Sequence, residues 1–332
     1  MTLPYVRLFL LGGTITMTSD SDTGSGVVPT LDAASLCQAV PGLDQVAQVE
    51  AETCQMLASS NLTYAHAISL ARDIQAAAES GDVDGFVVVQ GTDTIEETAF
   101  VLECLLDIPQ PIVVTGAMRN PSQVSADGPA NLLSAVTCAA SKSVGLAGVV
   151  VVLNDDIHSA RFVTKSHTGN VGAFQAANMG PIGRVVEGRA RLFTVPVAGP
   201  KIALPENISL PKVALVKVSY GDDGYLLNLV AGSDCQAVVI EGFGAGHVPE
   251  TYLDMLDQML PKMPIVLSSR IVAGHVLRDT YGFLGSEIDL IKRGLIPSGI
   301  LDGVKAKILL TLLLMSGYGS DEIQAVFEQW DF

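Results

Sequence analysis

The sequence has little charge and no basic excess. Only 16% of its 332 residues are charged, and 35 Asp and Glu against 19 Lys and Arg give a formal net charge of −16. Such an acidic surface repels phosphate, which argues against a nucleic-acid-binding protein. The hydrophobic fraction of 48% excludes a disordered chain, because disorder requires low hydrophobicity. An apolar chain with few charges predicts that much surface is buried, either between layers or between subunits.

Long hydrophobic runs are also missing, although the mean hydropathy is +0.41. A membrane-spanning helix needs about 20 apolar residues, and the longest candidate, Ile308 to Met315, is eight residues long and includes a threonine. The N-terminus, Met1 to Leu11, lacks the charged start, long apolar stretch and cleavage site of a secretory signal. We therefore expect a cytoplasmic protein with no membrane partner, although a chain from which a signal had been removed would look the same.

Cysteine is scarce, and its spacing suits neither zinc binding nor a disulfide framework. There is no Cys-x-x-Cys pair, and the cysteines lie far apart. Free cysteine packs as a small hydrophobe, so we expect buried free thiols in a reducing compartment. The five residues are Cys37, Cys54, Cys104, Cys138 and Cys235.

Several common enzyme signatures are absent as well. The chain has no GxxxxGK phosphate-binding loop, no HExxH zinc motif and no GxSxG nucleophile motif. The glycines at 242, 244 and 246 do not complete a dinucleotide-binding fingerprint. The scattered histidines lack metal-ligand spacing and are interpreted as structural. The chemistry must therefore come from something other than a histidine triad, a metal or a nucleotide.

What the chain does contain is an alternation of short β-branched runs with segments of helical period. This alternation is typical of a mostly parallel sheet covered on both faces. It stops in a proline-rich stretch, 181–211, which favours a connector or a hairpin, and then resumes. We predict an α/β protein with a large, mostly parallel, doubly wound N-terminal domain (1–190), a connector (191–212) and a smaller C-terminal α/β domain (213–332). The expected strands are 6–11, 85–89, 112–115, 149–153, 213–218, 237–240 and 265–267, and the expected helices are 64–79, 94–106, 131–140, 250–259, 304–315 and 320–329.

Polar residues gather where the predicted strands end, which is the edge at which parallel sheets bind ligands. The first strand is followed by two glycines that let the backbone turn sharply and project Thr14 into the crevice. Another strand is followed by Thr92 and Asp93, and the strand that ends at residue 153 leads through polar residues to Lys165. Plainer interpretations exist, because the polar segments also suit helix caps and the lysine suits a solvated surface charge.

Two threonines, an aspartate and a lysine at neighbouring strand ends predict nucleophilic catalysis. A threonine hydroxyl is inert until a base removes its proton. Lys165 is a candidate base if it is neutral, because burial and neighbouring groups can lower the pKa of a lysine, and Asp93 could hold it in place. Backbone N–H groups of a glycine-rich turn can stabilise an oxyanion. Together these groups predict acyl transfer to water.

These motifs resemble those of the bacterial-type L-asparaginases, the asparaginase/glutaminase family. The matching segments follow the family's order and spacing and cover most of residues 1–185, with weaker similarity through Ser268-Ser269-Arg270 and the helical tail. The segments are Leu11-Gly12-Gly13-Thr14-Ile15, Gln90-Gly91-Thr92-Asp93-Thr94-Ile95-Glu96-Glu97-Thr98, Val114-Thr115-Gly116-Ala117-Met118-Arg119, Ser125-Ala126-Asp127-Gly128-Pro129 with Asn131-Leu132, and Asn154-Asp155 with Arg161-Phe162-Val163-Thr164-Lys165.

The resemblance implies a threonine amidohydrolase that needs no cofactor and no metal. Thr14 would attack the side-chain amide carbon of the substrate and form an acyl-enzyme. A second group, Thr92, Asp93 and Lys165, would activate the nucleophile or the water, and which threonine acts first stays open. The resemblance also implies a homotetramer of close dimers, with sites between the large domain of one subunit and the small domain of its neighbour.

Substrate binding is implied at several of the matching positions. Ser59 would bind the α-carboxylate of the amino-acid substrate, Asp93 would bind its α-ammonium group, and the backbone of Ala117 would help to polarise the amide oxygen. The remaining substrate-binding positions are Gly13, Ser60 and Gly91.

The chain departs from the family pattern mainly in the parts that close over the substrate. Leu11 and Gln90 replace the usual threonine and histidine, the lid from Thr16 to Pro29 has no tyrosine, and His247 stands where asparagine is common. Hydroxyls that could replace the tyrosine belong to Ser21, Thr23 and Ser25. The glutamate that a neighbouring subunit supplies has no clear match, and the candidates are Asp279, Tyr281 and Glu287.

We therefore expect an L-asparaginase that hydrolyses L-asparagine to L-aspartate and ammonia. The missing lid tyrosine keeps open a related amidohydrolase that acts on glutamine, D-asparagine or another small amide or lactone. A binding module that senses asparagine or aspartate would have lost the catalytic set, which is retained here. An amidotransferase subunit would normally carry an extra N-terminal domain, and five residues precede the first predicted strand.

Overall fold

The computed structural model describes residues 2–19, 27–29, 31–205 and 207–331. The chain forms two compact units, residues 1–198 and 199–332, and each is described by itself. The division falls within the stretch predicted as a connector. Part of the proline-rich segment forms the hairpin of β11 (Gly183–Val186) and β12 (Arg189–Leu192), which pairs with the sheet of the first unit.

The first unit is built on a mixed sheet whose described strands lie in the order β12-β11-β8-β7-β6-β5-β1-β4. The strands from β7 to β4 are parallel, whereas β7, β8, β11 and β12 are joined by antiparallel pairs. The predicted α/β class with a mostly parallel sheet is confirmed. The remaining strand bounds are β1 Tyr5–Leu10, β4 Gln48–Thr53, β5 Gly85–Val89, β6 Ile112–Thr115, β7 Val149–Leu153 and β8 Asp156–Ser159.

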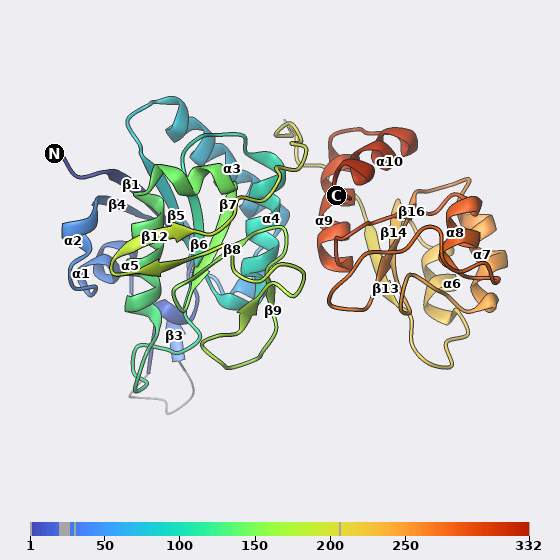
Figure 1. The fold of residues 1–332 in the computed structure, drawn as a ribbon, viewed down its shortest axis with the longest axis horizontal. Helices are drawn as coiled ribbons and strands as arrows, with labels where there is room; N and C mark the ends of the chain where they lie inside the picture. The colour runs from blue at the N-terminus through green and yellow to red at the C-terminus, as the bar shows by residue number, and fades with distance from the viewer. Residues whose placement is uncertain (1, 20–26, 30, 206, 332) are drawn as a thin grey trace. The chain divides into compact units, whose positions relative to one another are not determined.

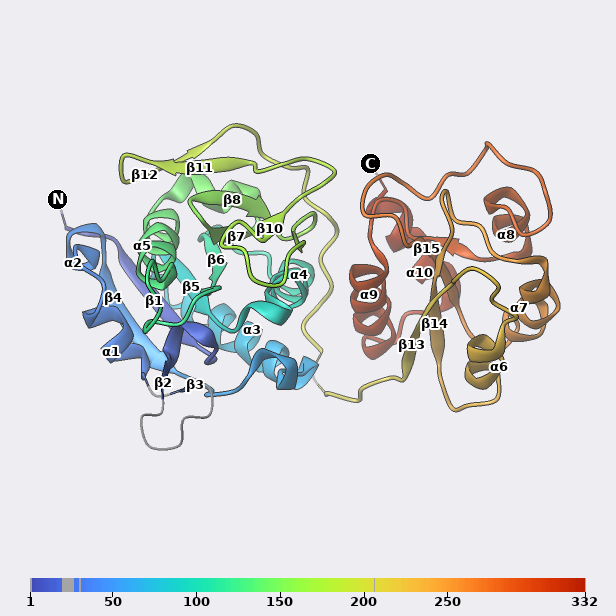
Figure 2. The ribbon, with the colours of Figure 1, turned by 90° about the horizontal axis from the view of Figure 1, so that it is seen from below.

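Helices cover both faces of this sheet (Figures 1 and 2). One face carries α1, α2 and α5, whose apolar residues share a core with Val87 and Val89 of β5. The other face carries α3 and α4, and there Phe86 stacks on Phe9. Alternate residues of each central strand therefore face different helices, which is why those strands are apolar throughout. The bounds are α1 Ala33–Gln38, α2 Leu43–Val46, α3 Tyr64–Glu79, α4 Ile95–Leu105 and α5 Gly128–Ala139.

Several short elements shape the loops between these strands and helices. The 3-10 helices η1, η2 and η3 each follow a strand or an extended segment, and η4 precedes β7. Their bounds are η1 Thr14–Thr16, η2 Ser59–Asn61, η3 Thr92–Thr94 and η4 Lys142–Ala147, and the two small antiparallel pairs are β2 Met17–Ser19 with β3 Val27–Pro29 and β9 Thr164–Lys165 with β10 Phe174–Gln175.

The second unit holds a parallel sheet in the order β13-β14-β15-β16. Helices α6, α7 and α8 connect successive strands and share one core with them, and α9 packs against β13, β14 and β15. The bounds are β13 Val213–Lys217, α6 Tyr225–Ala231, β14 Ala237–Gly242, η5 Glu250–Tyr252, α7 Leu253–Met259, β15 Ile265–Ser269, α8 Glu287–Arg293, β16 Ile296–Pro297, α9 Gly303–Met315 and α10 Ser320–Gln329.

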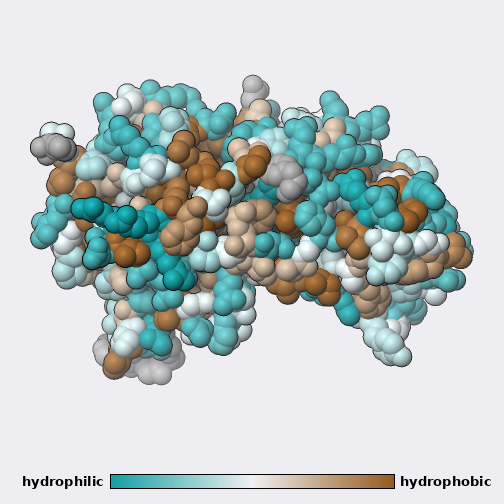
Figure 3. All heavy atoms as spheres, in the orientation of Figure 1, coloured by the Kyte–Doolittle hydropathy of each residue, from teal (hydrophilic) through white to brown (hydrophobic). Residues whose placement is uncertain are grey.

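The long apolar run of the sequence lies in α9, where most side chains are buried. Among the described residues, no helix is both long enough and apolar enough to span a bilayer. On the visible face of each unit, hydrophilic side chains lie among the apolar ones (Figure 3). The positive mean hydropathy therefore reflects buried strands and helices.

Candidate active site

Two neighbouring strands, β1 and β5, define the edge at which the predicted nucleophiles lie. After β1 the chain moves to β4 on one side, and after β5 it moves to β6 on the other side. Such a reversal opens a crevice beyond the carboxyl ends of the two strands. Leu10 at the end of β1 is paired with Val89 at the end of β5, so the strands end level with each other. The segments that carry Thr14 and Thr92 therefore leave the sheet side by side.

These two loops approach each other closely because two glycines lack side chains. Gly13 has a φ of 99°, and a Cβ on it would lie 2.2 Å from the backbone nitrogen of Gly91. A Cβ on Gly91 would lie 2.7 Å from Oγ of Ser59. No larger residue fits at either position without moving the loops. The glycines thus bring together three segments of the predicted site, and their contact with substrate stays a prediction.

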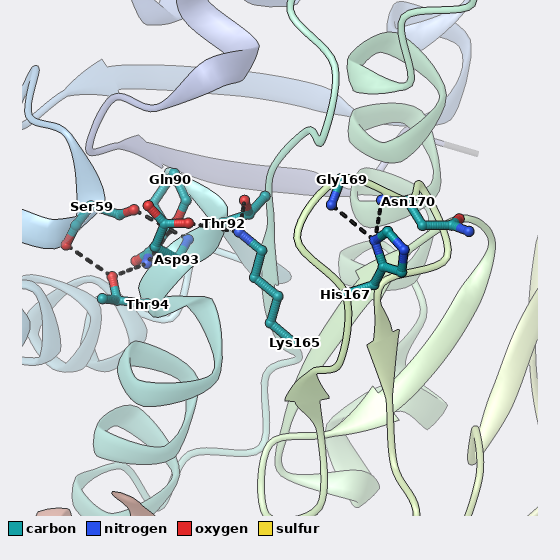
Figure 4. Close-up of polar contacts among 10 residues, drawn as sticks. Ser59, Gln90, Thr92, Asp93, Thr94, Lys165, His167, Gly169 and Asn170 are labelled. Atoms are coloured by element: carbon teal, nitrogen blue, oxygen red, sulfur yellow. Dashed lines mark hydrogen bonds and ion pairs between the residues drawn. The ribbon is translucent and has the colours of Figure 1, made fainter.

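Lys165 reaches the loop after β5 from the separate segment β9. Its Nζ donates to Oγ1 of Thr92 at 2.9 Å and to Oδ1 of Asp93 at 2.6 Å (Figure 4). The Lys165 side chain is 15% exposed, whereas that of Asp93 is 67% exposed. The lysine is therefore not a freely solvated surface charge, because it joins a buried hydroxyl to a carboxylate that faces solvent.

Thr14 begins η1 and is half-buried. Among the described residues, its hydroxyl makes no hydrogen bond, whereas the hydroxyl of Thr16 donates to the carbonyl of Gly13 at 2.8 Å and closes the turn. The candidate lid hydroxyls of Ser21, Thr23 and Ser25 lie outside the described residues.

The two adjacent serines of η2 lie in different environments. Ser59 is 3% exposed, and its Oγ accepts the backbone N–H of Asp93 at 3.2 Å. Ser60 is exposed on the same turn. The structure therefore brings Ser59 to the segment that contains Thr92 and Asp93, and it does not bring Ser60 to that segment by any hydrogen bond between described residues.

The loop after β6, which contains the buried Ala117, is held by Asp127. The Asp127 carboxylate accepts the backbone N–H of Met118 at 3.0 Å, that of Arg119 at 2.8 Å, and Nδ2 of Asn131 at 3.0 Å. Asp127 is the N-cap residue of α5, but its side chain makes no cap hydrogen bond. Asp127 thus begins the helix through its backbone, while its carboxylate fixes the loop after β6.

A pocket of about 390 Å³ opens beside the lysine, within the first unit. At its rim, Nδ1 of His167 accepts the backbone N–H groups of Gly169 and Asn170, each at 3.0 Å (Figure 4). With Nδ1 as acceptor, the ring proton of the neutral imidazole is on Nε2. The lining residues are Asp93, Glu96, Lys165, Ser166, His167 and Thr168.

Two family descriptions match the chain, one for each unit. "Asparaginase, N-terminal" matches residues 5–198, and "Glutaminase/Asparaginase C-terminal domain" matches residues 212–327. The chain belongs to the asparaginase family.

Relatives of known name align with nearly the whole asparaginase chain. A "Probable L-asparaginase" of Deinococcus radiodurans is 36% identical over 100% of this chain and 99% of that protein. "L-asparaginase 2" of Escherichia coli is 32% identical over 99% of this chain and 94% of its own. The crystal structure of a "Probable Cytoplasmic L-asparaginase" from Campylobacter jejuni superposes with a TM-score of 0.87 at 32% identity and covers 98% of this chain and 99% of that one.

The asparaginase C-terminal unit contains the candidates for a residue supplied to a neighbour. Glu287 is fully buried, and its carboxylate accepts the backbone N–H groups of Thr280 at 3.0 Å and Tyr281 at 2.6 Å and lies 3.1 Å from Nε2 of His247. Burial alone would raise the pKa of Glu287, but these hydrogen bonds outweigh it and hold the pKa below the usual 4.5. Glu287 is thus engaged within its own unit, whereas Asp279 and Tyr281 are exposed.

Metal ligation and thiol chemistry find little support in the described parts of this asparaginase. No group of three or more His, Cys, Asp or Glu there could hold a metal ion. All five cysteines are free. Burial raises the pKa of the Cys37 and Cys54 thiols to about 11 and that of Cys138 to about 12, so these three are poor nucleophiles near neutral pH.

Sequence reasoning missed three groups of the asparaginase site. Asp127 was placed in a matching motif, but its bonds to the loop after β6 depend on the folded path of the chain. His167 lies outside every motif, and its turn is local enough that a histidine followed by glycine and asparagine could have suggested it. Gln90 was noted only as a replacement for the usual histidine and Thr94 only as part of a motif, and the bond from Thr94 to Ser59 joins two separate segments.

Proposed function

We propose that this protein is an L-asparaginase that hydrolyses L-asparagine to L-aspartate and ammonia. The observation that supports this most strongly is the contact of Lys165 with both Thr92 and Asp93. This group lies at the sheet edge from which Thr14 also emerges. A lysine, two threonine hydroxyls and a carboxylate at one crevice suit amide hydrolysis through a covalent intermediate.

In the proposed reaction, the Thr14 hydroxyl attacks the side-chain amide carbon of the substrate. The C–N bond breaks, the nitrogen leaves as ammonia after it takes up a proton, and an ester to Thr14 remains. Water then attacks this ester and releases the aspartate side-chain carboxylate. The Lys165–Thr92 pair moves the protons in both steps. We assign the first attack to Thr14, because the Thr92 hydroxyl is already bound to Lys165 whereas that of Thr14 has no hydrogen-bond partner among the described residues.

The proposed substrate contacts follow from the same loops. Ser59 binds the α-carboxylate and Asp93 binds the α-ammonium group, which suits a carboxylate that is 67% exposed. The backbone of Ala117 polarises the amide oxygen, and the loop that follows it is held rigid by Asp127. Gly13, Ser60 and Gly91 complete the proposed substrate-binding set.

We also propose that the enzyme is a homotetramer of close dimers located in the cytoplasm. The segment 271–284 of the second unit exposes several large apolar side chains, and such a patch suits burial against another subunit. The five free cysteines suit a reducing compartment. The exposed residues are Ile271, Val272, Leu277, Tyr281, Phe283 and Leu284. Light scattering coupled to size-exclusion chromatography tests this, and a monomer would contradict it.

The test of the proposed activity is ammonia release measured on L-asparagine, L-glutamine and their D-forms. We expect L-asparagine to give the highest kcat/KM, and we expect Thr14→Ala and Thr92→Ala to abolish turnover while the purified variants stay folded. A panel without preference for L-asparagine would contradict the proposed substrate. Full activity of either variant would remove that threonine from the mechanism.

A further inference from the structure

The side chain of Gln90, at the end of β5, is fully buried against the candidate site. Its Nε2 donates to Oγ1 of Thr94 at 3.2 Å and to the carbonyl of Gly91 at 3.4 Å. Its Oε1 is buried and has no hydrogen-bond partner among the described residues. A buried acceptor left unpaired is costly, so an apolar residue would suit stability better than glutamine does. A role beyond packing is indicated for the amide.

The direction of the hydrogen bonds shows what the Gln90 amide does for its neighbour Thr94. The Thr94 hydroxyl donates to the carbonyl of Ser59 at 3.1 Å. A hydroxyl has a single hydrogen, so an amide that donates to Thr94 leaves this hydrogen free for Ser59. Ser59 in turn accepts the backbone N–H of Asp93 on its Oγ. A chain of hydrogen bonds thus runs from Gln90 through Thr94 to Ser59 and back to Asp93 (Figure 4).

This chain ties together two segments that are far apart in sequence. η2 carries Ser59, and η3 carries Asp93. The absence of a side chain at Gly91 lets Ser59 come close, and the Thr94 bond then fixes where it stops. The spacing between the Ser59 hydroxyl and the Asp93 carboxylate is therefore set by the Gln90–Thr94 pair. The bonds of Lys165 to Thr92 do not pass through this pair.

We propose that Gln90 and Thr94 are positioning residues that determine specificity for an α-amino acid, by holding Ser59 and Asp93 at the separation of an α-carboxylate and an α-ammonium group on one carbon. This rests on the proposed function, which assigns these two groups to Ser59 and Asp93. Loosening the pair weakens the binding of such substrates and products. The chemical step depends on Thr14, Thr92 and Lys165 and is affected less.

Four variants separate the hydrogen-bond direction from simple packing. Thr94→Val keeps the shape and removes the hydroxyl, and Thr94→Ser keeps the hydroxyl. Gln90→Glu keeps the shape but replaces a donor by an acceptor, so it draws the Thr94 hydrogen away from Ser59. Gln90→Met removes the unpaired oxygen and lets Thr94 keep its bond to Ser59.

The measurements are the Kd of L-aspartate by calorimetry, KM and kcat for L-asparagine, and the thermal midpoint Tm of each full-length variant. We expect Thr94→Val and Gln90→Glu to raise Kd and KM about tenfold, which is the size of effect that the loss of one hydrogen bond has on binding. We expect both variants to lower kcat less than about threefold. Thr94→Ser stays within about threefold of the wild type in all constants. Gln90→Met removes the donor that orients the Thr94 hydroxyl, so it raises Kd and KM, but by less than Gln90→Glu does, because Thr94 can still donate to Ser59. Gln90→Met keeps or raises Tm.

Four outcomes overturn the proposal. One is a Thr94→Val variant whose Tm falls while KM and Kd stay unchanged, which marks a purely structural bond. Another is a Thr94→Ser variant as impaired as Thr94→Val. The third is a wild type that neither hydrolyses L-asparagine nor binds L-aspartate, which removes the proposed function together with this inference. An active wild type with unaffected variants removes the inference alone.

Discussion

The loops at the carboxyl ends of the parallel strands use their charged residues in opposite ways in the two units. In the first unit, Lys165 connects a buried threonine hydroxyl to the mostly exposed Asp93, and a pocket opens beside the pair. In the second unit, Glu287 is fully buried and accepts two backbone N–H groups and the ring of His247. In both units, charged side chains lie where parallel strands end. Those of the first unit can meet a ligand, whereas Glu287 of the second unit is already occupied by its own neighbours.

Two lysines make the same contrast in more detail. Lys165 holds a hydroxyl and a carboxylate that can both meet a ligand. Lys305 is 1% exposed and pairs at 2.7 Å with Asp302, the residue whose side chain also caps the start of α9. We interpret the first lysine as a functional group and the second as part of the core. Exchanging each for methionine tests this difference, because methionine keeps the length and removes the charge.

The largest effect is expected for Lys165→Met. Loss of a group that moves protons in catalysis lowers kcat by about 10³-fold, which corresponds to about 4 kcal/mol of transition-state stabilisation. Stability should change by less than about 1 kcal/mol, since the Asp93 partner is largely solvated. Ammonia release and urea denaturation measure the two quantities. Lys142→Met, at an exposed lysine of the same unit, is the matched control. Near-normal kcat in Lys165→Met would place this lysine with Lys305 as a structural residue.

The converse result is expected for Lys305→Met. The change removes the buried ammonium group that pairs with Asp302 at the start of α9 and leaves that carboxylate only its cap hydrogen bond, and we expect the free energy of unfolding to fall by about 3 kcal/mol. The kcat per folded molecule stays near the wild-type value, because no catalytic group is touched. Urea denaturation and ammonia release measured well below the thermal midpoint check both. Lys307→Met, two residues along the same helix and half-buried, shows what the loss of a lysine charge there does by itself.

Much of the fold could be predicted because the central strands are apolar throughout and the helices have a clear period. Strands β5, β6 and β7 and helices α3 and α10 begin and end at the predicted residues. Strand β4 was missed, because it lies at the edge of the sheet and alternates with exposed polar residues. Residues 156–159 were interpreted as a polar tail of β7 but form the antiparallel strand β8, because Asn154 and Asp155 adopt positive φ and reverse the chain.

The candidate site likewise has features that could be predicted from the sequence and features that could not. Strand ends and motif order are local features, so they could nominate Thr14, Thr92, Asp93 and Lys165. Which of these groups touch depends on how the β9 segment returns to the sheet, and periodicity does not contain that information. The same holds for the bond between Thr94 and Ser59, which lie 35 positions apart. A buried side chain that is fully paired, such as Glu287, cannot be told from an available one by sequence alone.

A smaller effect is expected for Glu287→Gln. Glutamine keeps an oxygen for the N–H groups of Thr280 and Tyr281 but loses the negative charge, and we expect a loss of about 2 kcal/mol in unfolding free energy at pH 7. The pKa of Glu287 is lowered in the folded state, so this contribution is complete above the ordinary value of 4.5 and disappears as the pH falls through the lowered pKa. Urea denaturation of both proteins as a function of pH measures it. Glu250→Gln, at an exposed position, is the control, and a difference independent of pH would contradict the assignment.

The smallest effect, and one of opposite sign, is expected for His158 of β8. This imidazole is 2% exposed, and neither ring nitrogen has a hydrogen-bond partner among the described residues, in contrast to His247 beside Glu287. Burial lowers the pKa of His158 below 6.5, so the unfolded chain binds the proton more readily and stability falls as the pH drops below 6.5. His158→Leu removes two unpaired polar atoms and should raise the unfolding free energy by about 1 kcal/mol at pH 7.5, and by more at pH 5.5. Urea denaturation at the two pH values measures the gain.

Two results would contradict this expectation for His158. A variant less stable than the wild type at both pH values would mean that the ring packs better than leucine can. An equal gain at both pH values would mean that His158 does not titrate between them.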